Sequence, residues 1–282
     1  MLERIVLGAY FLFFPLVSIA SSFDCLIEPT QTVELASPIT GLLDKVHVKR
    51  GDRISKGQIL ALLESRAEQA TAELAKFKSE QVGPMHAAES KIEFSKRKFN
   101  RRRSMAAEKL MAAQESDDAE AELRLAESEL QVAKENREIA KLEFRQQSSL
   151  LNLRTIRSPF NGIVVDQMLY PGEVVEPGGS KKAILKVAQI DPLRVHVILP
   201  KEAFGKVNDG MSVDVTPEIP AKNKYTAKVK TIDRLVNAAS GTFVVFLEMA
   251  NPKLDVPAGV KCKAAFANID SSLAREASAL KK

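Results

Sequence analysis

Few side chains in this sequence have the types and spacing that catalysis or metal binding requires. The three histidines, His47, His86 and His196, lie far apart in the chain, and no two of them have the spacing of metal ligands. Asp117 and Asp118 are neighbouring carboxylates, but they lie in a segment of helical composition with no sign of a pocket. We therefore predict no catalytic residue and no metal site.

Nucleophile and phosphate-binding motifs are also missing. Ser180 follows a glycine but lacks the strand–turn–helix context of a hydrolase nucleophile. The sequence contains neither the P-loop pattern nor the glycine pattern of dinucleotide-binding proteins. We predict that the protein is not an enzyme and binds no cofactor.

The N-terminal segment is typical of an export signal. Residues 1–20 contain one Arg, an apolar run from Ile5 to Ile19 and a small residue, Ala20, at the exit. The run is shorter than the ~20 residues of a membrane span, so we favour a signal cleaved after Ala20 over an uncleaved anchor. Phe23 and Asp24 do not form the small-residue pair expected before a lipid-modified cysteine. The protein is thus expected in the periplasm, either free or associated with the inner membrane.

Two cysteines, Cys25 and Cys262, remain in the exported chain. Disulfides persist in exported proteins, but the sequence does not give the distance between the two residues. A possible disulfide and two buried thiols both stay open.

Charge gives no sign of nucleic-acid binding. The formal net charge is +5, and the basic run of residues 96–103 is followed by the acidic run of residues 115–129. The second run would cancel the field of the first, and no aromatic residues alternate with the basic ones as in nucleic-acid-binding surfaces.

One stretch of the chain occurs twice. The segment Ser37 to Glu64 returns from Ser158 onward, with a constant offset of 121 residues and the same Ser-Pro start. Short β-prone runs lie between glycines at matched positions, which we interpret as structural turn glycines. These glycines are Gly41, Gly51 and Gly57 in the first copy, and Gly162, Gly172 and Gly178 in the second.

Each copy is too small to fold alone, since units below about 40 residues rarely do. We therefore predict that the two copies pair into one β-sandwich. This pairing would bring Glu64 and Asn152, at the two ends of the intervening segment, close together.

The intervening segment has the composition of a long helical hairpin. In its second half, large residues and alanines form two series with a seven-residue spacing, which predicts the contact seam of a coiled coil. The series are Leu123, Leu130, Arg137, Phe144 and Leu151, and Ala119, Ala126, Ala133 and Ala140.

The first half predicts the other arm, in two registers. Met85, Ile92, Phe99 and Ala106 continue the spacing, whereas Ala67, Ala70, Leu74 and Phe77 precede them in a different register. Gly83-Pro84 lies where the register changes, and proline there is expected to kink or restart the helix. A turn near Lys109 to Gln114 would give antiparallel arms of roughly 60 Å at 1.5 Å per residue.

After Ala188 the sequence is strand-rich. Alternating runs separated by glycines predict five or six strands with one short helix at Glu202 to Val207, and hence a small closed barrel. The fold class is therefore α+β, multi-domain and elongated: a split lipoyl/biotinyl-like sandwich, interrupted by a coiled-coil hairpin and followed by a barrel.

The glycine spacing of the two copies resembles the biotinyl/lipoyl carrier fold, in which a lysine at a hairpin tip is modified. The corresponding residues here, Leu63 to Arg66, contain no lysine. A carrier function is therefore not expected.

The order of parts resembles the periplasmic adaptor proteins of the HlyD type, also called membrane fusion proteins, of tripartite efflux and secretion systems. The two repeated segments and Ile190-Asp191-Pro192-Leu193 carry this resemblance. It implies a homo-oligomeric ring, often of six subunits, between an inner-membrane transporter and an outer-membrane channel. The expected division is a signal peptide (1–20), an N-terminal strand segment (21–36), sandwich halves (37–64 and 153–188), a hairpin (65–152), a barrel (189–268) and a tail (269–282).

In this family the hairpin tip docks on the channel. One tip pattern is an Arg, a Leu four residues later and a Ser seven residues after the Leu; these places fall on Arg101, Met105 and Ala112. The docking residues implied by the resemblance are Arg101, Arg102, Met105, Lys109, Leu110, Met111 and Ala112.

The transporter class stays open. The short hairpin and a cleavable signal favour an RND-type efflux pump over an ABC-type or type I secretion exporter. An envelope scaffold without a transport role is a further alternative.

Overall fold

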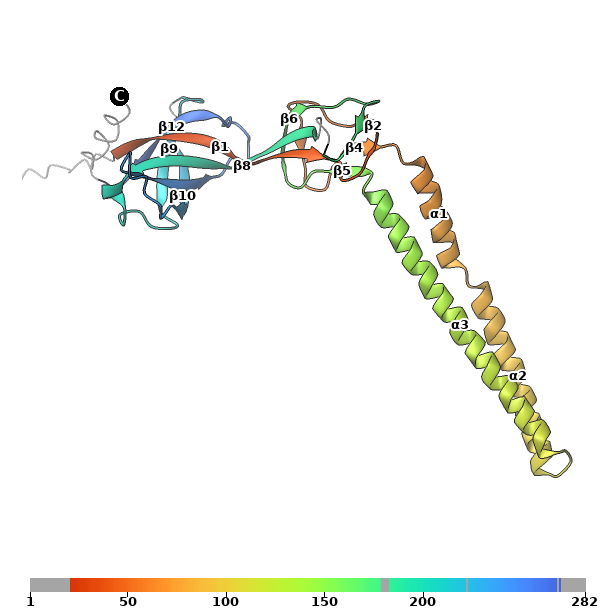
Figure 1. Cartoon of the computed structure of the whole chain (residues 1–282). Coiled ribbons are helices and arrows are strands. Elements are labelled where there is room, and N and C mark those ends of the chain that lie inside the picture. The colour runs from red at the N-terminus through yellow and green to blue at the C-terminus, as the bar shows by residue number, and fades with distance from the viewer. Residues whose placement is uncertain (1–20, 179–182, 222, 268, 270–282) are drawn as a thin grey trace, which may run out of the picture.

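In a computed structural model of the chain, residues 21–178, 183–221, 223–267 and 269 are described. Three bodies follow one another in space: a β-barrel, a β-sandwich and a long helical hairpin (Figure 1). The hairpin leaves the sandwich on the side opposite to the barrel. The predicted signal peptide, Ser180 and nearly all of the predicted tail lie outside the described residues.

The sandwich takes strands from both copies of the repeated segment. One sheet has the order β5-β4-β2-β7, so that first-copy strands β4 and β2 lie between β5, which directly precedes the second copy, and second-copy strand β7. This confirms the predicted pairing of the two copies. The strands are β2 (Gly41–Val46), β3 (Arg53–Ile54), β4 (Ile59–Leu63), β5 (Thr155–Arg157), β6 (Gly162–Gln167) and β7 (Val174–Val175).

The acidic residue after the second glycine of each copy closes a turn. The backbone N–H of Lys49 donates to Asp52 Oδ2 at 2.7 Å, and the N–H of Tyr170 donates to Glu173 Oε2 at 2.7 Å. The two turns are equivalent, and the adjacent glycines, Gly51 and Gly172, have φ of 91° and 94°. Glycine is favoured there because side chains clash at positive φ.

Gly41 and Gly162 are not turn glycines, which corrects the prediction for these two positions. Each begins a strand and lies close to other atoms. A Cβ on Gly162 would come within 2.2 Å of the carbonyl oxygen of Ala188, and one on Gly41 within 2.6 Å of Arg154 Nη1. These two glycines provide space rather than backbone freedom.

The hairpin has one interrupted arm and one continuous arm. Helices α1 (Arg66–Glu80) and α2 (Gly83–Ala107) form the first, and α3 (Ala113–Asn152) forms the second. The break before Pro84 and the turn between α2 and α3 lie where the sequence predicts them. Leu63 N–H donates to Arg154 O at 2.9 Å, so the two ends of the hairpin meet at the sandwich.

The residues predicted for the seam are buried or half-buried on α3, whereas the prediction for α1 is wrong. Every predicted seam residue of α3 is buried or half-buried, and Ala119 and Ala126 are almost fully buried. In α1, however, the predicted Leu74 and Phe77 are 54% and 63% exposed. The residues of α1 that are buried are Ala72, Ala75 and Ser79.

The barrel is closed by six strands. Its order is β1-β12-β9-β10-β11-β8, and β1 pairs with β8 to complete the circle. Its core is aliphatic and aromatic, with Phe243 and Phe266 almost fully buried. The strands are β1 (Ser21–Ala36), β8 (Ala183–Pro200), β9 (Ser212–Pro217), β10 (Tyr225–Ile232), β11 (Thr242–Met249) and β12 (Val260–Phe266).

Strands β1 and β8 run through both β-bodies. They pair antiparallel from Cys25↔Val197 in the barrel to Ala36↔Ala183 in the sandwich, and Figure 1 shows them crossing the junction side by side. β8 is therefore continuous across residue 189. The predicted helix at Glu202 to Val207 is only a 3-10 turn, Lys201–Ala203.

Among the helices described, none is both long enough and apolar enough to cross a membrane.

Candidate docking surfaces

The turn of the hairpin is compact. Leu110 N–H donates to Met105 O at 2.9 Å, and Lys109 N–H donates to Ala106 O at 3.0 Å. Lys109 adopts a positive φ of 58°, which reverses the chain between α2 and α3. The predicted docking residues are thereby gathered at the far end of the hairpin.

These residues expose both apolar and charged side chains at the tip. Leu110 is 68% exposed and Met105 37% exposed. Arg101, Lys109 and Ala112 are also exposed, whereas Met111 is half-buried.

Arg102 has a different position from the other predicted docking residues. Its Nη1 donates to Glu115 O at 3.2 Å and lies 3.8 Å from Glu115 Oε2. This side chain therefore joins the two arms below the turn.

Two further ion pairs hold the arms together. Lys91 Nζ lies 2.7 Å from Glu129 Oε1, and Lys98 Nζ lies 2.5 Å from Glu122 Oε2. The hydrogen bond from Lys98 holds the pKa of the Glu122 carboxyl below its usual value. These pairs fix the register of the arms more than they stabilise them, since solvent screens the attraction between exposed charges.

Arg154 connects the hairpin base to the sandwich. Its guanidinium pairs with Glu68 of α1 and donates to Thr40 O at 3.3 Å. Its side chain is only 20% exposed. Because Gly41 has no side chain, the guanidinium fits against β2.

The outer end of the barrel is a second exposed surface. We use this name for the loops of residues 201–211 and 233–241, which follow β8 and β10 on the side away from the sandwich. Leu235 is 86% exposed, Phe204 50% and Val236 42%. Phe204 and Arg234 line one hollow of about 330 Å³. We therefore treat the outer end of the barrel as a candidate contact surface.

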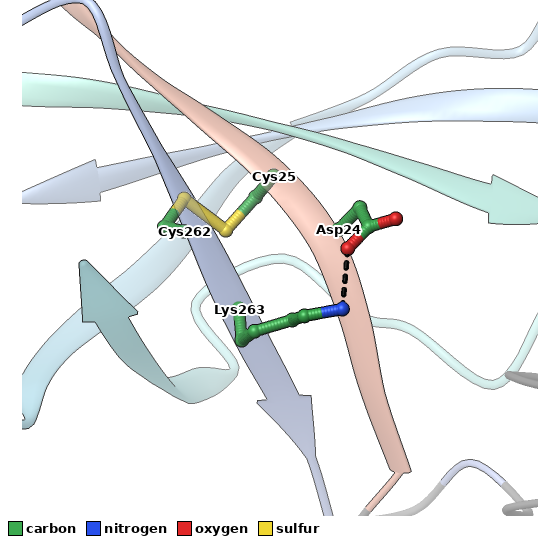
Figure 2. The surroundings of a disulfide bond; sticks show 4 residues. All are labelled: Asp24, Cys25, Cys262 and Lys263. Carbon is green, nitrogen blue, oxygen red and sulfur yellow. Dashed lines mark hydrogen bonds and ion pairs between the residues drawn. A yellow bond between two sulfur atoms is a disulfide. The ribbon is translucent and has the colours of Figure 1, made fainter. Parts of the chain in front are cut away.

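A disulfide joins the first and last strands of the barrel. Cys25 of β1 and Cys262 of β12 are directly opposite each other in the ladder and are bonded through their sulfurs (Figure 2). Beside them, Lys263 Nζ donates to Asp24 Oδ1 at 2.5 Å. The barrel is thus closed by a covalent bond between residues 237 positions apart.

A cleft of about 610 Å³ lies where β1 and β8 pass from the sandwich to the barrel. Its walls are mostly apolar and include Pro29, Ile163 and Leu254. Arg53 crosses from the sandwich and donates to Lys253 O at 3.3 Å. The cleft therefore marks the joint between the two β-bodies.

The position of a carrier lysine is occupied by an ion pair. Arg66 Nε lies 2.7 Å from Glu64 Oε1, and this contact lowers the pKa of the Glu64 carboxyl. In the part of the chain that the structure describes, no group of three or more His, Cys, Asp or Glu side chains could hold a metal ion.

Residues 31–189 match the family described as CzcB-like, barrel-sandwich hybrid domain. The chain belongs to this family. Its match covers the sandwich and the inserted hairpin, and it confirms the resemblance to membrane fusion adaptors, which are non-enzymatic scaffold proteins.

Relatives of this CzcB-like chain include proteins of known name. The pyoverdine export membrane fusion protein PvdR of Pseudomonas putida is 25% identical over 207 residues, 73% of this chain and 53% of PvdR. The multidrug resistance protein MdtA of Photorhabdus laumondii is 25% identical over 231 residues, 80% of this chain and 54% of MdtA. The chain thus spans about half the length of these relatives.

Solved structures share the fold. MacA from Actinobacillus actinomycetemcomitans superposes with a TM-score of 0.69 at 22% identity, covering 88% of this chain and 78% of MacA. The membrane fusion protein Spr0693 from Streptococcus pneumoniae gives 0.56 at 18% identity, covering 88% and 99% of the two chains.

Sequence reasoning missed the outer end of the barrel. Leu235 and Val236 are two adjacent apolar residues in a loop that is otherwise polar or small. This pattern is the signal that could have indicated a contact surface.

Proposed function

We propose that the protein is a periplasmic adaptor that links an inner-membrane transporter to an outer-membrane channel and thereby supports export. One observation carries this proposal. The turn between α2 and α3 and the outer end of the barrel lie at opposite ends of an elongated molecule (Figure 1). They expose Leu110 and Leu235, respectively. A protein of this shape can contact two partners at once.

The hairpin is the part that spans distance. A 40-residue helix, α3, extends for roughly 60 Å at 1.5 Å per residue, and we propose that it forms a coiled coil with α1 and α2. The hairpin tip would bind the channel through Met105 and Leu110. Coupling between the partners would pass through these contacts without chemistry.

The barrel would rest on the transporter through its outer end. We propose an RND-type efflux pump as this transporter, with an ABC-type or type I exporter as the alternative. Export of small molecules is supported by the names of the relatives, a pyoverdine exporter component and a multidrug resistance protein. The domain division given above and a homo-oligomeric ring, with six subunits as one possibility, belong to the same proposal.

The proposed location is the periplasm. Export by the signal in residues 1–20 would place every described helix and strand on that side of the inner membrane. The bond between Cys25 and Cys262 is consistent with an oxidising compartment.

The experiment is a deletion of the gene, with export of a fluorescent efflux substrate as the readout. An adaptor predicts that the substrate accumulates in the deletion strain and that the wild-type chain restores export. The Leu110→Glu variant, folded by circular dichroism and present at the wild-type level, should not restore it. Unchanged accumulation in the deletion strain would favour the scaffold reading.

A further inference from the structure

The cleft at the joint between the sandwich and the barrel has the size of a small-molecule site. Its volume of about 610 Å³ lies within the range of roughly 300–1,000 Å³ that is typical of such sites. Both β-bodies contribute to its walls: Arg53, Ile163 and Val165 come from the sandwich, and Leu254 and Val256 come from the barrel. A molecule in this cleft would therefore contact both bodies at once.

The sandwich wall of the cleft is apolar, although it lies outside the sandwich core. On β6, Val164 is buried in that core. Ile163 and Val165 point to the other face of the strand, where they are half-buried and pack against the barrel core. Part of their apolar surface stays accessible in the cleft, and covering it with an apolar molecule would be favourable.

The barrel wall is held in place by a buried side chain. Asn251 is 1% exposed, and its Nδ2 donates to Ile190 O and to Val256 O, both at 3.0 Å. The backbone N–H of Val256 donates in turn to Asn251 Oδ1 at 3.3 Å. These bonds tie the loop after β11 to strand β8. The shape of this wall is therefore fixed without a ligand.

Leu254, in the same loop, has an unfavourable backbone conformation. Its φ is 56°, in the left-handed region that bulky side chains rarely adopt. Its N–H donates to Asn251 O at 3.0 Å, so the loop that Asn251 anchors also imposes this conformation. Backbone strain of this kind is concentrated at ligand-binding and active sites. Here it places Leu254 in the wall of the cleft.

The cleft also carries one positive charge. Among the described residues that line it, Arg53 alone has an ionisable side chain. Its Nη2 donates to Lys253 O at 3.3 Å, and within the described residues no carboxylate forms an ion pair with this guanidinium. A guanidinium has further N–H donors that match the two oxygens of a carboxylate. The polar end of a ligand in this cleft is thus expected to be an anion.

We propose that this cleft binds a small amphiphile with an apolar body and one anionic group, such as a carboxylate. The apolar body would lie against Ile163, Val165 and Leu254, and the anionic group would pair with Arg53. The site goes beyond the proposed adaptor role, which uses the two ends of the molecule and assigns no ligand to the joint. The volume fits a molecule of this size and excludes a folded protein domain.

The experiment is isothermal titration calorimetry of the purified full chain with decanoate, and with decyltrimethylammonium as a cation of the same chain length. The anion should bind roughly tenfold more tightly than the cation, because only the anion can pair with Arg53. Arg53→Gln should weaken decanoate binding by about the same factor and remove the preference, whereas Arg53→Lys should keep part of it. Equal binding of the two ligands, or no binding of decanoate, would overturn the proposal.

Two further variants test where the ligand binds. Ala258→Trp adds a large side chain to the lining of the cleft and should abolish decanoate binding. Arg50→Gln is the matched control, because Arg50 lies outside the lining and its side chain is 77% exposed beside Asp166. It removes a nearby positive charge and should leave the affinity unchanged. Circular dichroism establishes that each variant is folded.

The same variants can refute the site. If folded Ala258→Trp still binds decanoate, or if Arg50→Gln weakens binding as much as Arg53→Gln, the ligand lies elsewhere and the proposal fails. Calorimetry uses the chain alone, so these results do not depend on the adaptor role.

Protein purified from cells can show the source of the ligand. Native mass spectrometry compares the wild-type chain with the Ala258→Trp variant. A linear fatty acid found on the wild type alone would support the proposal and indicate a lipid-derived ligand. A ring-containing carboxylic acid would support it and indicate an exported compound. A neutral or cationic molecule that is lost from the variant would overturn the proposed chemistry.

Discussion

The backbone N–H of Gly51 donates to the carbonyl oxygen of Val164 at 2.9 Å. The backbone N–H of Gly172 donates to the carbonyl oxygen of Leu43 at 2.8 Å, which is the equivalent bond with the roles of the two copies exchanged. Each copy of the repeated segment therefore closes its turn on a strand of the other copy. Neither copy can complete its backbone hydrogen bonds alone, and this explains how the two copies form one body across the inserted hairpin.

The equivalent glycines Gly41 and Gly162 are expected to differ in their tolerance of a side chain. Gly162→Ala places a Cβ against the carbonyl oxygen of Ala188 in β8, which cannot move without disturbing the sheet. We expect the free energy of unfolding to fall by about 2–3 kcal/mol. Chemical denaturation of the purified variant measures this change.

Gly41→Ala is the matched control. Its Cβ meets the end of the flexible Arg154 side chain, which can swing aside, so we expect a loss below about 1 kcal/mol. Equal losses in the two variants would contradict this explanation of the two glycines.

Reduction of the disulfide is expected to destabilise the barrel. The bond closes a loop of almost the whole chain, and the chain-entropy account gives up to about 5 kcal/mol for such loops. Thermal unfolding with and without a reducing agent should show a clear drop in the melting temperature. The double variant Cys25→Ala and Cys262→Ala should melt at the temperature of the reduced wild-type protein, whether or not the reducing agent is present. If the reducing agent still lowers the melting temperature of this variant, the effect has a cause other than the disulfide.

Acid is expected to weaken the pairing of the hairpin arms. The pKa of Glu122 is lowered in the folded protein by the hydrogen bond from Lys98. The stabilisation from this pair is therefore fully present above the unfolded pKa, about 4.3, and is lost as the pH falls through the lower folded pKa. Thermal melting of the helical circular dichroism signal between pH 7 and pH 3 measures this loss.

Glu122→Gln should remove part of that pH dependence. Glu138 provides the control, because its pKa is also lowered, but by Lys141 on the same helix. We expect that Glu138→Gln does not change the pH at which the two arms separate. The distance between spin labels on α2 and α3 measures this separation. The account is contradicted if the two variants shift this pH equally.

The sequence was most informative where contacts are local or repeated. The two copies and the seam of α3 could be predicted because a constant offset and a constant spacing each reflect one repeated contact. The seam of α1 could not, because the interruption at residues 81–82 changes the phase of the helix by an amount that the composition does not show. Leu74 and Phe77 satisfy the spacing of a seam, yet their side chains are exposed.

The long-range parts of the fold were less accessible. Strand β1 enters the barrel through partners near the other end of the chain, such as Cys262 opposite Cys25. No local pattern indicates which distant strand will pair with it. For the same reason, the sequence does not show that the loops holding Phe204 and Leu235 lie at the same end of the barrel. Only the pairing of the strands brings these two loops together.

The most direct test of the adaptor role is photo-cross-linking in cells from a benzoylphenylalanine placed at Leu110 and, in a second strain, at Leu235. Both side chains are exposed, at 68% and 86%. One belongs to the hairpin turn and the other to the outer end of the barrel, which lie at opposite ends of the molecule (Figure 1). The account predicts an outer-membrane protein captured from Leu110 and a different, inner-membrane protein captured from Leu235. Capture of the same protein from both positions, or of no partner from either, would contradict it.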